Sequence, residues 1–138
     1  MDAMITADQI LAHLVGDYLT QSNWMATEKV RRWIPAAAHA TVYSLGFLFF
    51  HPSPAAWLVI LGSHLLIDRF RLARYLVWAK NLLLAPPLET LELTAAGLPA
   101  VSATGYPDST PTWLAVWLLI IADNIVHLTV NGLALKFL

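Results

Sequence analysis

The chain has 138 residues, of which 58% are hydrophobic and only 12% are charged. A soluble domain of this size carries roughly a quarter of charged residues, so the composition indicates a membrane protein. The mean hydropathy of +0.61 agrees with this interpretation. The absence of cysteine excludes disulfides and thiolate metal sites, and the net charge of −1 argues against general nucleic-acid binding.

Four helices are expected along the chain, at about residues 7–22, 33–50, 55–84 and 112–138. The first is short and polar for a membrane span. Pro35 is tolerable in the first turn of the second helix, and His51 to Pro54 form a turn before the third. The third helix becomes basic after Ile67, whereas the fourth is the clearest candidate span, at roughly the length that a bilayer requires.

Two connecting segments differ from the helices in composition. The connector 23–33 is basic, and residues 85–111 contain five prolines and two glycines, which predicts a loop with a short helix around Glu89 to Ala96. We therefore predict a single integral membrane domain over residues 1–138. Its fold class is all-α, a polytopic membrane protein built as a four-helix transmembrane bundle.

Lysine and arginine are distributed unevenly. Seven of the eight lie in the connector or late in the third helix, namely Lys29, Arg31, Arg32, Arg69, Arg71, Arg74 and Lys80. If all four helices cross, both places lie on the same side, which the positive-inside rule makes cytoplasmic. We expect a protein of the bacterial inner membrane with the connector 23–33 in the cytoplasm. If the first helix is re-entrant, the N-terminus moves to the cytoplasmic side.

Pairs of His and Asp spaced four residues apart interrupt the apolar helices. They are His13 with Asp17, His64 with Asp68 and, in reversed order, Asp123 with His127. One helical turn places both members of a pair on the same face. In this topology the fourth helix runs opposite to the first and third. The reversed order therefore places His nearer the outside and Asp nearer the cytoplasm in every pair. We expect them to meet in one polar centre of the bundle, which His39 of the second helix completes.

Such a centre suits a divalent metal. Imidazole and carboxylate together favour zinc, manganese or iron, and zinc is the first choice. The candidate ligands are His13, Asp17, His39, His64, Asp68, Asp123 and His127. They exceed the four ligands of one tetrahedral zinc, so either two ions bind or some of these residues orient the others.

Other polar residues extend the predicted centre. An aspartate that is not bound to metal could act as the catalytic general base, and the candidates are Asp17, Asp68 and Asp123. Residues that could contact substrate or support the ligands are Gln21, Lys29, Arg69, Arg71, Asn124 and Asn131. Each pair taken alone also has a purely structural interpretation instead of metal binding, because His and Asp one turn apart form local hydrogen bonds.

Three segments resemble the signatures of a family of small bacterial and phage integral membrane proteins of unknown function. They read LAHLVGDYLTQ (Leu11 to Gln21), SHLLIDRFR (Ser63 to Arg71) and ADNIVHL (Ala122 to Leu128). The chain departs from the family at Asn124 and Arg71, where Gln and Lys are usual, and both changes keep the polar character. The resemblance implies a membrane protein and these polar positions, but no established activity.

The pattern is also similar, more distantly, to membrane-bound metal-dependent hydrolases, zinc phospholipase C-type enzymes and cation-diffusion zinc transporters. We therefore expect a membrane-embedded, metal-dependent hydrolase with one or two divalent ions, acting on a lipid or lipid-linked phosphoester. One alternative is a divalent-cation or proton translocator that uses the same residues. Another is a non-catalytic membrane effector or assembly module. The expected partners are membrane lipids, including anionic headgroups, and no nucleic acid, and a homo-oligomer is left open.

Overall fold

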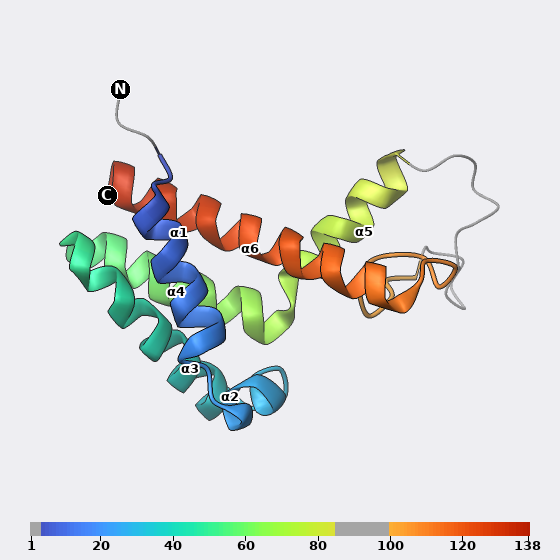
Figure 1. Cartoon of the computed structure of the whole chain (residues 1–138), viewed down its shortest axis with the longest axis horizontal. Coiled ribbons are helices and arrows are strands. Elements are labelled where there is room, and N and C mark those ends of the chain that lie inside the picture. The colour runs from blue at the N-terminus through green and yellow to red at the C-terminus, as the bar shows by residue number, and fades with distance from the viewer. Residues whose placement is uncertain (1–3, 85–99) are drawn as a thin grey trace. The chain divides into compact units, whose positions relative to one another are not determined.

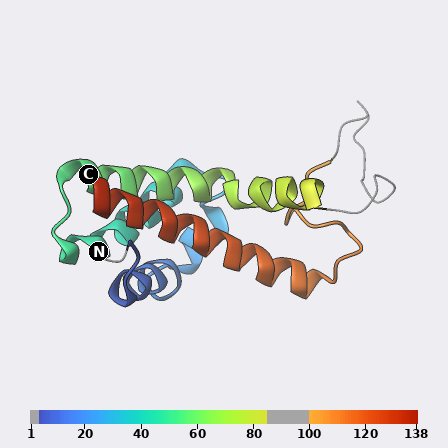
Figure 2. The same cartoon turned by 90° about the horizontal axis from the view of Figure 1, so that it is seen from above.

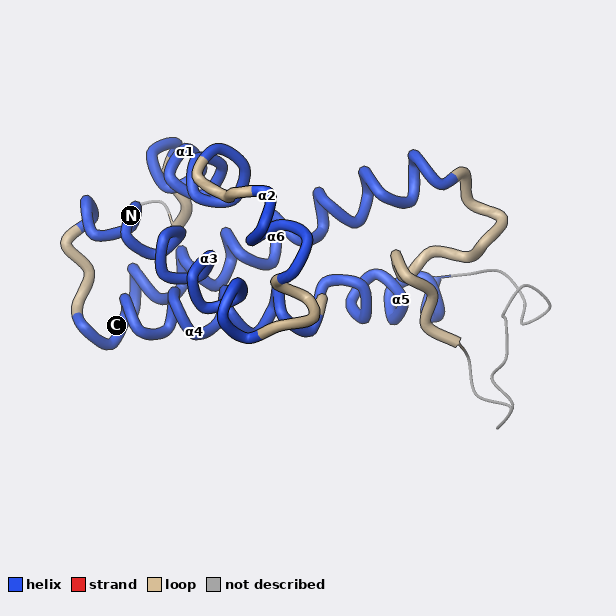
Figure 3. Tube along the Cα trace, turned by 90° about the horizontal axis from the view of Figure 1, so that it is seen from below, coloured by secondary structure: helices blue, strands red, loops and turns tan. Residues whose placement is uncertain are grey.

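The computed structural model describes residues 4–84 and 100–138, which form six α-helices, one π-helix and one 3₁₀-helix, with no strand in these two ranges (Figure 3). The predicted all-α class is confirmed. The chain divides into two compact units. The first runs to Arg71 and includes Ile125–Leu138, and the second is Leu72–Asn124. Helix α6 (Thr112–Phe137) contributes to both units.

The predicted first helix changes type along its length. Helix α1 (Ala7–Leu14) begins with a capping box, in which the Thr6 hydroxyl accepts from the Gln9 amide and the Gln9 side chain accepts from the Thr6 amide. The chain then continues as the π-helix η1 (Val15–Leu19). A π-turn contains one residue more than an α-turn, so side chains beyond it point in a different direction than in a regular helix.

The connector 23–33, in which no helix was predicted, is partly helical. It contains helix α2 (Asn23–Glu28), which Ser22 caps by accepting a hydrogen bond from the Met25 amide. A serine followed by good helix formers is sufficient for two short turns, although the basic residues after them obscured this signal.

The second predicted helix is confirmed as α3 (Trp33–Leu45), followed directly by the 3₁₀-helix η2 (Gly46–Phe50). Helix α4 (Pro54–Phe70) starts after Ser53, whose hydroxyl accepts from the Ala56 amide, and proline occupies its first turn. Helices α3 and α4 pack against each other. Small buried residues on both, such as Ala40 and Ala56, let the backbones approach closely.

The prediction of one helix over 55–84 is wrong. Arg71 adopts the left-handed conformation with φ of 52°, which ends α4, and α5 (Leu72–Leu84) follows. A left-handed residue is a common helix terminator, but it is usually glycine or asparagine. Because neither glycine nor proline occurs at this position, the sequence contains no signal for the break.

In the first unit, α1 and η1 pack against α3 and η2, and α1 runs across the direction of α4 (Figures 1 and 2). The core of this unit consists of Tyr43, Phe47, Ala56, Ile60 and Ala134. The polar residues of the predicted centre lie beside this core.

The second unit contains α5, residues 100–111 and the first half of α6. Residues 100–111 form no helix, as predicted, and the Asn81 amide donates to the Gly105 carbonyl at 3.0 Å. Gly105 has a φ of 79°, and a side chain there would meet the backbone of Arg74. The short helix predicted around Glu89 to Ala96 lies outside the described residues.

Two described segments are long and apolar enough to cross a membrane, Trp33–Phe50 and Thr112–Phe137. Core helices of soluble proteins can meet the same criterion. The first predicted helix and α4 do not meet it, so two of the four expected spans have this support.

Candidate metal centre

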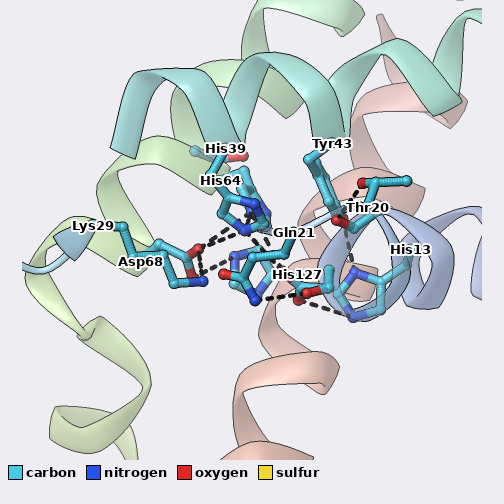
Figure 4. A network of polar contacts seen from close by, with 12 residues as sticks. His13, Thr20, Gln21, Lys29, His39, Tyr43, His64, Asp68 and His127 are labelled. Atoms are coloured by element: carbon cyan, nitrogen blue, oxygen red, sulfur yellow. Dashed lines mark hydrogen bonds and ion pairs between the residues drawn. The ribbon is translucent and has the colours of Figure 1, made fainter. Parts of the chain in front are cut away.

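Four of the predicted ligands meet inside the first unit. Asp17 comes from η1, His39 from α3, and His64 and Asp68 from α4. All four are buried, and one ligand atom from each lies within 4.8 Å of the other three. Figure 4 shows His39, His64 and Asp68 facing one another across α3 and α4.

Five of the six distances between these atoms are close to the edge length of a tetrahedral metal site. His39 Nε2 lies 3.0 Å from His64 Nε2, and 3.1 Å from both Asp17 Oδ1 and Asp68 Oδ2. His64 Nε2 lies 3.6 Å from Asp17 Oδ1 and 3.3 Å from Asp68 Oδ2. Zinc binds nitrogen at about 2.0–2.1 Å and carboxylate oxygen at about 2.0–2.2 Å, so the edges of its tetrahedron measure about 3.3 Å. The side chains therefore surround a space of the size that such an ion needs.

The electrostatic environment favours the metal-binding protonation states of Asp17, Asp68 and His64. Burial opposes ionisation of Asp17 and Asp68, but hydrogen bonding to His39 together with the charges of neighbouring groups outweighs it and lowers both pKa values. For Asp68 the Lys29 ammonium, whose Nζ lies 2.6 Å from Oδ2, helps to hold the pKa well below its usual range. Burial lowers the pKa of His64 to about 4, so this ring is neutral at pH 7 and retains a nitrogen lone pair.

Each imidazole of the cluster uses the same nitrogen. The Nδ1 atoms of His39 and His64 are buried and have no hydrogen-bond partner among residues 4–84 and 100–138. Both Nε2 atoms, in contrast, contact the two carboxylates. The polar edges of both rings therefore point into the same space.

Three further predicted residues border this cluster. His127 Nε2 of α6 lies 3.8 Å from Asp68 Oδ1, and His13 Nε2 of α1 lies 3.8 Å from Asp17 Oδ2. Gln21 donates to the backbone carbonyl of Asp17 at 2.9 Å, so it supports the turn rather than the carboxylate. The two histidines thus lie beside Asp17 Oδ2 and Asp68 Oδ1, the carboxylate oxygens on the other side from His39 and His64.

Tyr43 is an important residue of the site that the sequence did not single out. Its ring stacks on His64 with centroids 3.6 Å apart, and its hydroxyl contacts His13 Nδ1 at 2.8 Å. Asn131 donates to the same hydroxyl at 2.5 Å. The only sequence signal was its position four residues after His39, on the same helical face. Gly16 permits this arrangement, since a Cβ there would lie 2.7 Å from Tyr43 Cδ2.

Four other predicted residues are not members of this four-residue cluster. Arg69 donates to the backbone carbonyls of Val30 and Arg31 and packs over the Trp33 ring, so it joins the connector to the end of α4. Arg71 is exposed and ends α4. The two others, Asp123 and Asn124, belong to the second unit, on the first half of α6.

A mainly apolar pocket of about 320 Å³ lies between α1, η1, α3 and η2. Leu11, Val15 and Phe49 line it, and Gly16 and Tyr43 form the side nearest to the cluster. The first unit thus combines a polar centre suited to a divalent cation with an adjacent apolar cavity.

Comparison with known proteins identifies the family of this chain. Residues 5–85 match the model of the family described as "Protein of unknown function (DUF3307)". The matched residues include all four members of the cluster, whereas the segment from Ala122 to Leu128 lies beyond them. No curated protein and no solved structure matches the chain. Because the match covers more than half of its residues, the chain belongs to the DUF3307 family, whose function is unknown.

Proposed function

We propose that the protein is a membrane-embedded, metal-dependent hydrolase that acts on a lipid or lipid-linked phosphoester. The observation that carries this proposal is the near-tetrahedral spacing of four ligand atoms from η1, α3 and α4. Buried carboxylates are costly unless they are paired or bind a metal. The Lys29 ammonium pairs with Asp68, and Asp17 adds a second buried carboxylate to the same space, so the cluster has a physical reason to hold a further cation there.

Zinc is the ion that best suits these ligands. Two imidazoles and two carboxylates form a tetrahedral set typical of zinc, and manganese and iron also accept this combination. Asp17 and Asp68 supply two negative charges, of which the Lys29 ammonium offsets one. The side chains thus provide a ligand geometry and a net negative charge that favour one bound cation.

Groups next to the four ligands support hydrolysis of a phosphoester. Zinc held by these four residues would lower the pKa of a water bound as a fifth ligand toward neutrality and so would supply hydroxide. Lys29 reaches the cluster at Asp68, and its side chain is 16% exposed, so it can meet a phosphate oxygen that arrives from outside. His127, whose Nε2 lies 3.8 Å from Asp68 Oδ1, is an imidazole that would accept the proton lost by this water. The water oxygen would bond to phosphorus as the ester P–O bond breaks, and His127 would return the proton to the leaving alkoxide.

A lipid substrate agrees with the surface of the first unit. Large apolar side chains are exposed on several of its helices, including Leu11, Ile34, Phe49 and Leu58. Exposed apolar surface of this extent favours contact with a membrane. The adjacent pocket could take a hydrocarbon chain, and the basic connector could meet anionic headgroups.

One observation favours a second candidate, a divalent-cation translocator. When Nε2 of His39 or His64 binds an ion, the ring proton moves to Nδ1, which has no acceptor within residues 4–84 and 100–138. An unsatisfied buried donor costs about 1–3 kcal/mol, which weakens the hold on the ion. A weakly held ion on a full set of protein ligands suits transport better than permanent retention.

The first experiment measures the metal content of the protein purified in detergent without chelator. We expect about one zinc per chain, and loss of this zinc in His64→Ala. The matched control is His51→Asn, which removes an exposed imidazole in the turn before α4, where asparagine tolerates the left-handed backbone. Asp123→Ala shows whether the carboxylate of the second unit adds a ligand.

The second experiment separates enzyme from translocator. Zinc-loaded protein is tested for release of phosphate from vesicles that contain phosphatidic acid or a long-chain isoprenyl phosphate, and for zinc flux into liposomes. Phosphate release that is lost in His64→Ala supports the hydrolase, and flux without hydrolysis supports the translocator. Wild-type protein without stoichiometric metal under metal-replete conditions would contradict both proposals and leave the assembly module.

A further inference from the structure

The Tyr43 hydroxyl connects α6 to α1 through two hydrogen bonds. Asn131 Nδ2 lies 2.5 Å from the hydroxyl oxygen, and His13 Nδ1 lies 2.8 Å from it. All three side chains are buried, with at most 1% of each residue exposed. Figure 4 shows the Tyr43 hydroxyl directed at the His13 ring. These three groups form one continuous polar chain within the first unit.

Counting hydrogens gives this chain a direction. An amide nitrogen can only donate, and a tyrosine hydroxyl has a single hydrogen. Asn131 therefore donates to the hydroxyl oxygen, and the direction that uses the single hydroxyl hydrogen within this chain is donation to His13 Nδ1. A neutral imidazole that accepts at Nδ1 carries its hydrogen on Nε2. That N–H faces Asp17 Oδ2, which lies 3.8 Å from Nε2.

We infer that Asn131, Tyr43 and His13 form a directed hydrogen-bond chain that presents the His13 Nε2–H group to Asp17 and so orients its carboxylate. His13 is then a positioning residue rather than a metal ligand. The two oxygens of Asp17 have separate roles, because Oδ2 faces His13 whereas Oδ1 faces His39 and His64. The effect on the carboxylate rests on the proposed metal centre, whereas the direction of the chain does not.

Tyr43 is well placed for this role because its ring is held on two sides. It stacks on His64 at an interplanar angle of 13°, and it lies against Gly16 in the turn before Asp17. The Tyr43 ring therefore contacts the His64 imidazole, and the Tyr43 hydroxyl determines which nitrogen of His13 carries the hydrogen. Groups that orient ligands in this way typically change metal affinity by about 10- to 100-fold.

The decisive measurement is the tautomer of His13, read by nitrogen-15 NMR of histidine-labelled full-length protein kept free of metal with a chelator. In the wild type we expect Nδ1 of His13 to be unprotonated and Nε2 to carry the hydrogen. Asn131→Asp replaces the donor by an acceptor, so the Tyr43 hydroxyl turns toward the new carboxylate. His13 must then donate from Nδ1, and its hydrogen moves away from Asp17.

Tyr43→Phe retains the ring and removes only the hydroxyl. We expect it to abolish the preference of His13 for one tautomer and to weaken zinc binding by about 10- to 100-fold. Tyr75→Phe, which removes an exposed hydroxyl in the second unit, is the matched control and should change neither quantity.

Two results would overturn the inference. One is a wild-type His13 protonated at Nδ1, and the other is an Asn131→Asp variant that folds with an unchanged His13 tautomer. If Tyr43→Phe fails to fold, the wild-type spectrum and Asn131→Asp still decide the matter. Because the tautomer is measured without metal, a protein with the expected tautomer that binds no zinc refutes the proposed metal centre and not the hydrogen-bond chain.

Discussion

Asp17→Asn tests the proposed metal centre with the smallest change in shape. In the structure, Asp17 Oδ1 accepts from His39 Nε2 at 3.1 Å and lies 3.6 Å from His64 Nε2. Asparagine can keep the oxygen that accepts from His39, but it removes the negative charge and leaves a much weaker metal ligand. The variant therefore separates binding of a cation from support of the fold.

The expected magnitude follows from the number of ligands. Structural zinc sites bind with about 10–16 kcal/mol, which is about 2.5–4 kcal/mol for each of four ligands. Loss of one ligand then raises the Kd for zinc about 100- to 1000-fold. In the metal-free protein we expect the free energy of unfolding to change by no more than about 1 kcal/mol, since the hydrogen bond remains and a like charge facing Asp68 is removed.

Zinc affinity is measured at pH 7 by competition with a chromogenic chelator, and stability by thermal unfolding in detergent with the metal removed. Asp108→Asn is the control, because it removes an exposed carboxylate of the second unit. The reasoning is refuted if Asp17→Asn binds zinc as tightly as the wild type. A loss of several kcal/mol in the metal-free variant would also refute it, because it would assign Asp17 to the fold.

Two other substitutions test the surroundings of the cluster. Lys29→Met leaves the Asp68 carboxylate buried without its ammonium, so it should destabilise the metal-free protein by about 3–5 kcal/mol. Saturating zinc should restore part of this loss, and an equal zinc-induced rise in Tm for variant and wild type would contradict the prediction. Gly16→Ala places a Cβ 2.7 Å from Tyr43 Cδ2 and should cost about 1–3 kcal/mol in thermal unfolding. Its control is Gly62→Ala, where a Cβ would meet no atom within 4 Å in the described part of the chain, so equal losses would disprove the close packing.

Local signals explain which elements could be predicted. The span 33–50 is continuous and apolar, and the start of α4 is marked by Ser53 and Pro54. The prediction failed at Arg71, which adopts the left-handed backbone conformation although its Cβ atom disfavours it. It also missed the π-helix that contains Asp17, because no residue type specifies one extra residue in a helical turn.

The His/Asp spacing predicted pairs on common helix faces, and this local property belongs to the sequence alone. Which atoms meet across helices was decided by tertiary packing, because distances between α3, α4 and η1 depend on how closely their backbones approach. Small residues such as Ala40 and Ala56, and the contact of Gly16 with Tyr43, set that approach. The sequence thus identified the side chains that could bind a metal. Only the tertiary structure brought ligand atoms of Asp17, His39, His64 and Asp68 within 4.8 Å of one another and placed His13 next to the Asp17 carboxylate, because those distances depend on contacts between residues far apart in the chain.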